Sequence, residues 1–202
     1  MNERRPSGDR KAEILTATLD LAFEVGPYNV TTGMIAGRLG LSQPAIYKHF
    51  PNKEDVWRAA SEMLCARIVG NAEAGGQAGR TPMERLRQLV MSHVQLIAEI
   101  PALPEIMATR DPAGSLTDAR RRIQAAMGIF RRAAAQQLEQ ARATGELRRG
   151  VQTDDGITLV FGVIQSLALR LILTRDPAPL LREGARLLDL QLSLFTGEGD
   201  AA

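Results

Sequence analysis

Residues 31–55 have the sequence TTGMIAGRLGLSQPAIYKHFPNKED, which predicts two short helices around a tight turn and the start of a third helix. Thr31 can cap the first helix because its hydroxyl can accept a hydrogen bond from an unpaired backbone N–H. Gly40 can close that helix at little conformational cost, and Pro44 suits the first turn of the second helix. Asn52 can cap the third helix. Two helices joined in this way form a helix-turn-helix, whose second helix lies in the major groove of DNA.

The outward side of the second helix carries side chains that suit DNA. Gln43 can hydrogen-bond to adenine or to other base edges, and the small apolar side chains beside it can touch thymine methyl groups. Basic side chains on the same side can approach phosphates. The residues expected to face DNA are Gln43, Pro44, Ala45, Tyr47, Lys48 and His49, together with Lys53 at the start of the following helix.

The charge distribution supports this interpretation only locally. Residues 1–60 contain eight Lys and Arg residues against seven Asp and Glu residues, so the bulk charge does not indicate nucleic acid. However, no Asp or Glu lies between Glu24 and Glu54, and a surface that approaches polyanionic DNA should lack carboxylates. From the residues alone, a capped helical hairpin in an unrelated all-α domain remains the alternative.

The composition favours closely packed helices. Of the 202 residues, 45% are hydrophobic but only 4% are aromatic, so the core must consist mainly of aliphatic side chains. Cys65 is the single cysteine, which excludes an internal disulfide framework and fits a reducing cytoplasm. No apolar run precedes Ile14, so we expect no signal peptide. We also expect no membrane span, because no uncharged run reaches about 20 residues.

Apolar residues recur at helical spacing along the rest of the chain, and Pro and Gly residues separate the periodic segments. The polar segment 1–9 predicts a mobile arm, and the small residues of segment 70–79 predict a loop. Long helices are expected over residues 10–25, 52–71, 82–99, 117–144, 155–173 and 180–195.

The helix expected over residues 155–173 is apolar on almost every side, and the last helix is rich in leucine. Only buried helices tolerate that pattern, and two of them exceed what one small body can bury. A homodimer through a four-helix contact is the simplest explanation, and its twofold symmetry would match two DNA half-sites about 34 Å apart. A monomer that uses both helices as core is the alternative. The expected interface residues are Val160, Ile164, Leu167, Leu171, Leu187, Leu188 and Gln191.

Residues 26–56, GPYNVTTGMIAGRLGLSQPAIYKHFPNKEDV, resemble the DNA-binding head of the TetR family of transcriptional regulators. The similarity runs from about Lys11 to Trp57, and IYKHFPNKED is its most specific part. The resemblance implies an all-α protein of about nine helices. It also implies an arm at residues 1–9, a helix-turn-helix DNA-binding domain at 10–55, and a regulatory ligand-binding and dimerisation domain at 56–202.

The resemblance adds Thr31 and Thr32, at the start of the first motif helix, to the expected DNA contacts. One position departs from the family pattern: many members carry Arg where this chain has Gly33, so one contact fewer is expected there. The implied function is a cytoplasmic, nucleoid-associated repressor. It binds a palindromic DNA operator as a homodimer and is released by a small, mostly apolar effector, without a cofactor.

The implied ligand pocket lies among the middle helices. Methionines suit adaptable apolar pockets, and a polar His93 on an apolar helix face needs a hydrogen-bond partner that a ligand could supply. A neighbouring backbone carbonyl could supply it equally well. The candidate ligand-binding residues are Met63, His93, Ile97, Met107, Met127, Phe130 and Gln165.

Two other classes of function are alternatives to a repressor that an effector releases. An enzyme is not expected, because the chain has two His, one Cys and no glycine-rich phosphate loop. A metal site is not expected either, since His93 has no neighbouring Cys or His at ligand spacing. The second alternative is a TetR-like DNA-bound protein that acts through a protein partner without a small-molecule effector.

Overall fold

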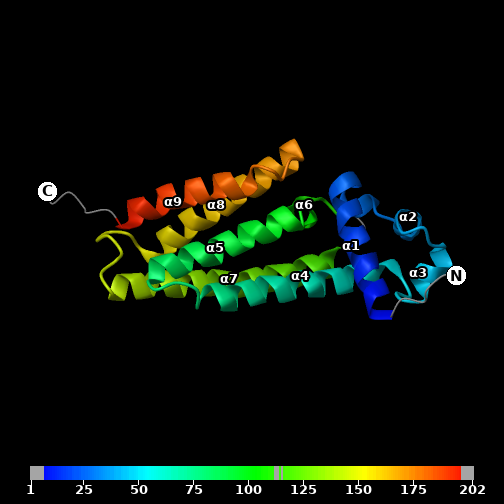
Figure 1. Ribbon diagram of the computed structural model, residues 1–202, viewed down its shortest axis with the longest axis horizontal. Coiled ribbons are helices and arrows are strands. Elements are labelled where there is room, and N and C mark those ends of the chain that lie inside the picture. The colour runs from blue at the N-terminus through cyan, green and yellow to red at the C-terminus, as the bar shows by residue number, and fades with distance from the viewer. Residues whose placement is uncertain (1–6, 112–113, 115, 197–202) are drawn as a thin grey trace. The chain divides into compact units, whose positions relative to one another are not determined.

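A computed structural model describes residues 7–111, 114 and 116–196. Over these residues the chain forms nine α-helices and one 3-10 turn, with no β-strand, which confirms the predicted all-α fold (Figure 1). The elements are α1 (Ser7–Val25), η1 (Pro27–Asn29), α2 (Thr32–Arg38), α3 (Gln43–Tyr47), α4 (Lys53–Gly75), α5 (Pro82–Glu99), α6 (Ala102–Ala108), α7 (Thr117–Ala143), α8 (Thr153–Thr174) and α9 (Leu180–Thr196).

Contacts divide the described residues into two compact units. The first takes the described parts of Met1–Cys65 and Ile100–Gln124, and the second takes those of Ala66–Glu99 and Ala125–Ala202. The expected DNA-binding segment therefore lies in the first unit. That unit also contains α6 and the start of α7, because α6 packs on α1 and η1. Helix α1 begins at Ser7, so the last three residues of the expected arm are helical, and residues 1–6 lie outside the described residues.

In the first unit, α1 packs against α2, η1 and α6, and α2 packs against α3. Ile14, Ile35 and Ile46 are each 1% exposed or less and form the centre of this core. Arg120 of α7 holds the end of α6. Its Nε donates to the carbonyl oxygen of Ile106 at 2.7 Å, and its guanidinium also donates to a carbonyl just beyond that helix. These bonds satisfy carbonyls that a helix end leaves unpaired.

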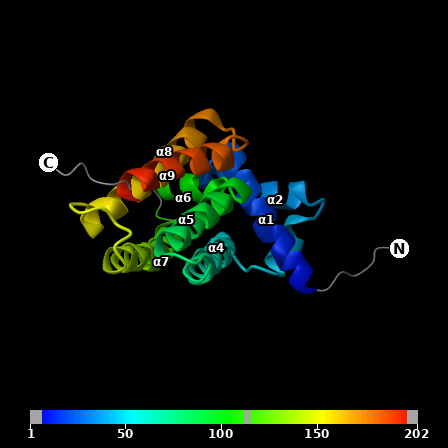
Figure 2. The ribbon, with the colours of Figure 1, turned by 60° about the vertical axis from the view of Figure 1, so that its left-hand side comes forward.

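In the second unit, α9 packs along α5 and α8, and the three helices lie side by side in both ribbon views (Figures 1 and 2). A Cβ atom at Gly184 of α9 would lie 3.1 Å from Val94 Cγ1 and 3.2 Å from Leu167 Cδ1. A side chain at this position would require these two methyl groups to shift by a few tenths of an ångström, because the three helices approach closely there. The close approach fixes which sides of α8 and α9 are buried within the chain.

Helix α4 is longer than expected. The small residues of segment 70–79 were predicted to form a loop, but the helix continues to Gly75, and this part of the prediction was wrong. A Cβ atom at Gly75 would lie 2.6 Å from Leu89 Cα. The glycine is therefore required by a close contact between the backbones of α4 and α5 rather than by a turn.

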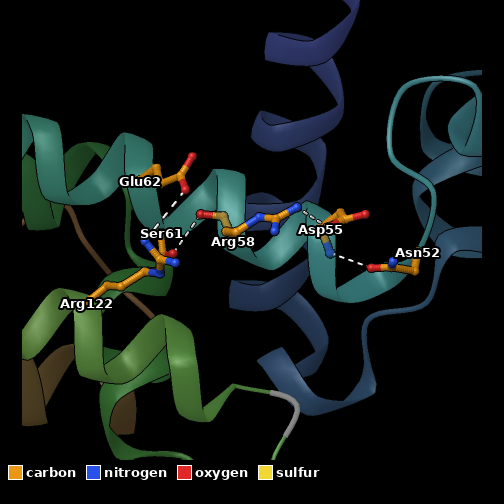
Figure 3. Close-up of polar contacts among 6 residues, drawn as sticks. All are labelled: Asn52, Asp55, Arg58, Ser61, Glu62 and Arg122. Atoms are coloured by element: carbon orange, nitrogen blue, oxygen red, sulfur yellow. Dashed lines mark hydrogen bonds and ion pairs between the residues drawn. The ribbon is translucent and has the colours of Figure 1, made fainter.

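Polar contacts run along the N-terminal half of α4, and one of them reaches α7 (Figure 3). Arg58 pairs with Asp55 one turn earlier, and the hydroxyl of Ser61 donates to the carbonyl oxygen of Arg58 at 2.7 Å. Arg122 of α7 lies 3.7 Å from the carboxylate of Glu62. The side chains of both members of this last pair are about half exposed, so the pair is worth less than about 1 kcal/mol.

Helix α8 is long and apolar enough to cross a membrane by length and composition alone, and it is the one such helix among the described residues. The helix is nevertheless not uncharged over its whole length, because Arg170 lies within it. The apolar character of α8 is explained in part by packing, since Val160, Ile164 and Leu171 are buried within the second unit.

Candidate functional site

The helix-turn-helix forms through the capping residues that the sequence indicated. The hydroxyl of Thr31 accepts a hydrogen bond from the backbone N–H of Met34 at 3.2 Å. Gly40 has a φ of 63°, a left-handed conformation that costs little for glycine. The side-chain oxygen of Asn52 accepts from the backbone N–H of Asp55 at 2.7 Å. These local features fix where α2 begins and ends and where α4 begins.

Helix α3 has one buried and one outward side. Ile46 and, just after the helix, Phe50 are 0% and 5% exposed and anchor it on the core. The outward side has no carboxylate, in agreement with the expected DNA-reading surface. On it Gln43, Pro44, Tyr47 and Lys48 are exposed, and Ala45, His49 and Lys53 are partly exposed.

Three polar side chains from α2 and α3 meet at this surface. The amide nitrogen of Gln43 donates to the hydroxyl of Thr32 at 2.7 Å, and the hydroxyls of Thr32 and Tyr47 lie 3.2 Å apart. Thr32 is only 7% exposed, so little of its side chain is open to solvent, and its role as a DNA contact stays a prediction. The inward direction of Thr32 depends on how α2 and α3 cross, and the spacing of residues along the chain does not give that angle.

The basic side chains around α3 differ in whether a nearby carboxylate offsets their charge. Lys53 donates from Nζ to the carbonyl oxygen of Tyr28 at 3.3 Å, which leaves its charge uncompensated and available to a phosphate. Lys48 is exposed. Arg38, by contrast, lies 2.5 Å from the carboxylate of Glu24, and its hydrogen bond holds the pKa of that carboxyl below its usual value. Its charge is therefore offset by a nearby carboxylate.

The expected ligand residues fall into separate places. His93, Ile97 and Phe130 are buried and Met127 is partly buried, all within the second unit. The rings of His93 and Phe130 lie 4.8 Å apart, and Phe161 of α8 extends the cluster at 5.8 Å from Phe130. Partly buried Met63 and Met107 belong to the first unit, and Gln165 is exposed on α8.

His93 is the one of these residues with an unusual electrostatic environment. It is 3% exposed, and its Nδ1 has no hydrogen-bond partner among the described residues. Burial lowers the pKa of its imidazole to about 4. The ring is therefore neutral at physiological pH and presents an uncompensated polar atom inside the helical body.

This pKa predicts how stability depends on pH. In the unfolded chain His93 should titrate near pH 6.5, so between about pH 6.5 and 4 the unfolded state binds more protons and the free energy of unfolding falls as the pH falls. From pH 7 to pH 5 the wild type should lose about 2 kcal/mol more than His93→Gln. Urea unfolding at both pH values measures this, and equal losses in the two proteins would contradict the burial of a neutral imidazole.

The expected dimer residues require a correction. Val160, Ile164, Leu167, Leu171 and Leu188 are each 5% exposed or less within one chain, so they cannot line a surface that meets a second copy. Leu187 and Gln191 are partly exposed. Helix α8 is apolar on nearly all sides, so its periodicity could not indicate which side packs within the chain. The leucines that remain outside are Leu159, Leu169 and Leu173 on α8 and Leu181, Leu190 and Leu194 on α9, at 38% to 73% exposure.

Among the described residues, no group of three or more His, Cys, Asp and Glu side chains is placed to hold a metal ion. Cys65 is partly buried, and burial raises the pKa of its thiol. The polar network of α2 and α3 is therefore the most developed candidate site in the described chain.

Comparison with known proteins agrees with this geometry. Residues 14–60 match the model of the bacterial regulatory proteins of the tetR family, and solved structures of TetR-family regulators share the fold over nearly the whole chain. Residues 14–60 therefore form a DNA-binding head of the TetR type. The resemblance stated from the sequence is thereby confirmed. Regulators of this family are non-enzymatic DNA-binding proteins, so the expectation that the chain is not an enzyme is also confirmed.

Individual relatives match this chain over different lengths. The tetracycline repressor of class A from Escherichia coli is 45% identical over 53 residues, which cover 26% of this chain and 24% of that protein. The nucleoid occlusion factor SlmA of Marinobacter nauticus is 28% identical over 154 residues, 75% of each chain. The match to SlmA of Haemophilus influenzae spans about half of each protein, so the chain covers a quarter to a half of several curated relatives.

Two solved structures show the extent of the shared fold. The ketosteroid regulator KstR2 of Mycobacterium tuberculosis has a TM-score of 0.77 at 19% identity, covering 94% of this chain and 96% of that one. SmeT in its triclosan complex has a TM-score of 0.71 at 24% identity, covering 95% and 93%. The fold is therefore shared along more than nine-tenths of the chain, whereas the 45% identity to the tetracycline repressor extends over only 53 residues.

Proposed function

We propose that this protein is a homodimeric repressor that binds a palindromic DNA operator and is released by a small, mostly apolar effector. The observation that carries the proposal is the outward side of α3, which has no carboxylate and presents Gln43, Tyr47 and Lys48. In this arrangement α3 enters the major groove and Gln43 reads base edges. The basic side chains around α3 contact DNA phosphates and so fix the orientation of the protein on the duplex.

The homodimer is supported by the exposed leucines of α8 and α9. Monomeric proteins rarely expose large apolar patches, and two copies that bury these leucines against each other through both helices would form a four-helix contact. Twofold symmetry then presents two copies of α3 to two half-sites. In this proposal residues 10–55 read DNA, residues 56–202 dimerise and bind the effector, and the protein acts in the cytoplasm at the nucleoid.

The effector part of the proposal is supported by the cluster of His93, Phe130 and Phe161. A buried aromatic group with one unpaired polar atom suits an apolar ligand that carries one hydrogen-bonding group. SmeT, which shares this fold, is solved as a complex with the small molecule triclosan. An effector releases DNA only if it binds the non-binding conformation more tightly, and typical couplings are about 1–3 kcal/mol.

A second candidate follows from the similarity to SlmA, which is named as a nucleoid occlusion factor. In this alternative the DNA-bound dimer acts through a protein partner and has no small-molecule effector. The two candidates differ in one measurement. An effector-responsive repressor leaves its operator when a suitable small molecule is added to the purified complex, whereas the alternative remains bound.

The DNA part of the proposal predicts two distinct mutant phenotypes. Gln43→Ala should cost about 1–3 kcal/mol on the preferred sequence and relax base preference at one position of each half-site. Lys53→Ala should weaken binding to all sequences and lower the slope of log affinity against log salt by about 1.

Selection from a randomised DNA library, followed by titration of the chosen duplex at several salt concentrations, measures both phenotypes. Scrambled duplex of the same length is the control. Identical effects of the two variants on every sequence would contradict the assigned roles. Failure of the wild type to prefer any inverted repeat over scrambled DNA would overturn the proposed function itself.

A further inference from the structure

A groove with a volume of about 350 Å³ lies in the second unit, between the end of α4 and α7. The two helices run side by side in both ribbon views (Figures 1 and 2). The groove is lined by Ala72, Glu73, Gly76, Gln77, Ile129, Ala133, Gln136, Gln137 and Gln140. These residues belong neither to the helix-turn-helix, nor to the His93 cluster, nor to the exposed leucines of α8 and α9, so the proposed function leaves this groove without a role.

Arg85 of α5 fixes the orientation of two glutamine side chains in the groove. Its Nε donates to Oε1 of Gln137 at 2.8 Å, and another nitrogen of its guanidinium donates to Oε1 of Gln140 at 3.1 Å. A guanidinium donates hydrogen bonds and cannot accept them. Each amide must therefore turn its oxygen towards Arg85 and its NH₂ group away from it.

The NH₂ group of Gln137 lies at the wall of the groove. A Cβ atom at Gly76, another lining residue, would be 3.8 Å from Nε2 of Gln137. Gln137 is only 4% exposed, so packing holds its side chain in place. Among the described residues, neither Gln137 nor Gln140 has an acceptor for its amide nitrogen. Both side chains can therefore donate to an oxygen of a ligand in the groove.

The charge of Arg85 indicates which kind of oxygen is favoured. Its third hydrogen bond goes to the carbonyl oxygen of Gly79 at 3.4 Å, so all three acceptors are neutral, and within the described chain no carboxylate pairs with it. A positive charge behind two amides polarises them and strengthens their bonds to an anionic acceptor. Glu73 is the one carboxylate in the lining, but it is exposed, so water and salt screen its repulsion.

The groove also offers apolar surface. Ala133 and Ile129 lie about one and two turns before Gln137 on α7, and both line the groove. Ile129 is 39% exposed, so an apolar group placed on it would remove hydrocarbon surface from water.

We infer that this groove is a second ligand site, which binds a small organic acid with an apolar body. The carboxylate accepts hydrogen bonds from the amides of Gln137 and Gln140, and the apolar body lies on Ala133 and Ile129. The site is separate from the buried His93 cluster proposed for the effector.

The test compares benzoate with benzamide, which has nearly the same shape but no charge, and with inorganic phosphate, which has no apolar body. Gln137→Glu keeps the size of the side chain, gives Arg85 an anionic partner and removes the NH₂ donor. The matched control is Gln88→Glu, which makes the same charge change at an exposed position of α5 outside the groove. Titrations of the full-length chain, followed by the NMR signals of the glutamine side-chain amides, measure each dissociation constant.

The wild type and Gln88→Glu should bind benzoate about fivefold or more tightly than benzamide, and more tightly than phosphate. Gln137→Glu should weaken benzoate binding by about tenfold or more, while its thermal unfolding stays at or above that of the wild type because an ion pair replaces the bond to Arg85. Glu73→Gln should tighten benzoate binding by about twofold through the loss of a like charge and leave benzamide binding unchanged.

Equal affinity of the wild type for benzoate and benzamide would refute the inference, as would unchanged benzoate binding in Gln137→Glu. Benzoate binding that is lost in His93→Gln but kept in Gln137→Glu would place the acid in the His93 cluster and refute it as well. If Gln137→Glu does not fold, the response of Glu73→Gln and the preference of the wild type for benzoate decide the question. No DNA enters these measurements, so their outcome is independent of whether the protein recognises an operator.

Discussion

Leu169→Arg in α8 is expected to turn the dimer into a monomer and to abolish tight operator binding. Leu169 is 58% exposed in the single chain, so an arginine there can remain in water and the protomer should fold normally. In the proposed dimer the same arginine would be buried without a partner, which costs about 3–5 kcal/mol. That energy corresponds to a dissociation constant raised by a factor of about 100 or more.

The matched control is Ile129→Arg on α7. Ile129 is 39% exposed and also belongs to the second unit, so it tests the addition of an arginine to an exposed apolar position outside α8 and α9. Sedimentation equilibrium measures the association, and thermal unfolding checks the fold. A dimer that survives Leu169→Arg, and also Leu190→Arg on α9, would exclude this face as the interface.

Gly75→Ala in α4 is expected to destabilise the protein, whereas Gly70→Ala in the same helix should stabilise it. A Cβ atom at Gly75 would lie 2.6 Å from Leu89 Cα and 2.9 Å from Leu89 Cβ. Because one of these atoms is backbone, α4 and α5 must move apart, and overpacking of this kind costs about 1–3 kcal/mol. At Gly70 a Cβ atom meets nothing within 4 Å, and replacing a helical glycine by alanine gains about 0.5–1 kcal/mol.

The two variants differ by the same methyl group in one helix, so intrinsic helix propensity cancels in the comparison. Urea unfolding should place their midpoints on opposite sides of the wild-type midpoint. If both substitutions stabilise the protein to the same degree, the close packing of α4 on α5 is refuted. If both destabilise it, the open surroundings of Gly70 are refuted instead.

The DNA-binding head could be predicted from the sequence because its structure depends on local signals. Caps at Thr31 and Asn52, a left-handed Gly40 and apolar residues at helical spacing act within a few residues of one another. Helix α3 begins without a side-chain cap: Ser42 precedes it in extended conformation, but its side chain makes no capping hydrogen bond. The proline in the first turn already removes one of the donors that such a cap would satisfy.

The remaining features depend on contacts between helices and were not predictable in the same way. The segment around Gly75 has the glycine-rich composition of a loop. Gly75 itself is needed because the backbone of α5 lies too close for a side chain. Helix α8 is apolar on nearly all sides, so its periodicity does not indicate whether Val160 or Leu159 faces the core. The meeting of Thr32 with Gln43 depends on the angle between α2 and α3, which no residue spacing specifies.

The half-exposed pair between Arg122 and Glu62, described above for α4 and α7, affects how salt titrations should be interpreted. The two charges lie 3.7 Å apart, so added salt screens their attraction only partly. This weakening of the ion pair occurs over the same range of ionic strength in which counterion release weakens DNA binding. A measured salt slope would then contain a contribution from loosened helix packing as well as from phosphates. Replacing both members of the pair by glutamine would separate the two contributions, so that the slope counts phosphate contacts alone.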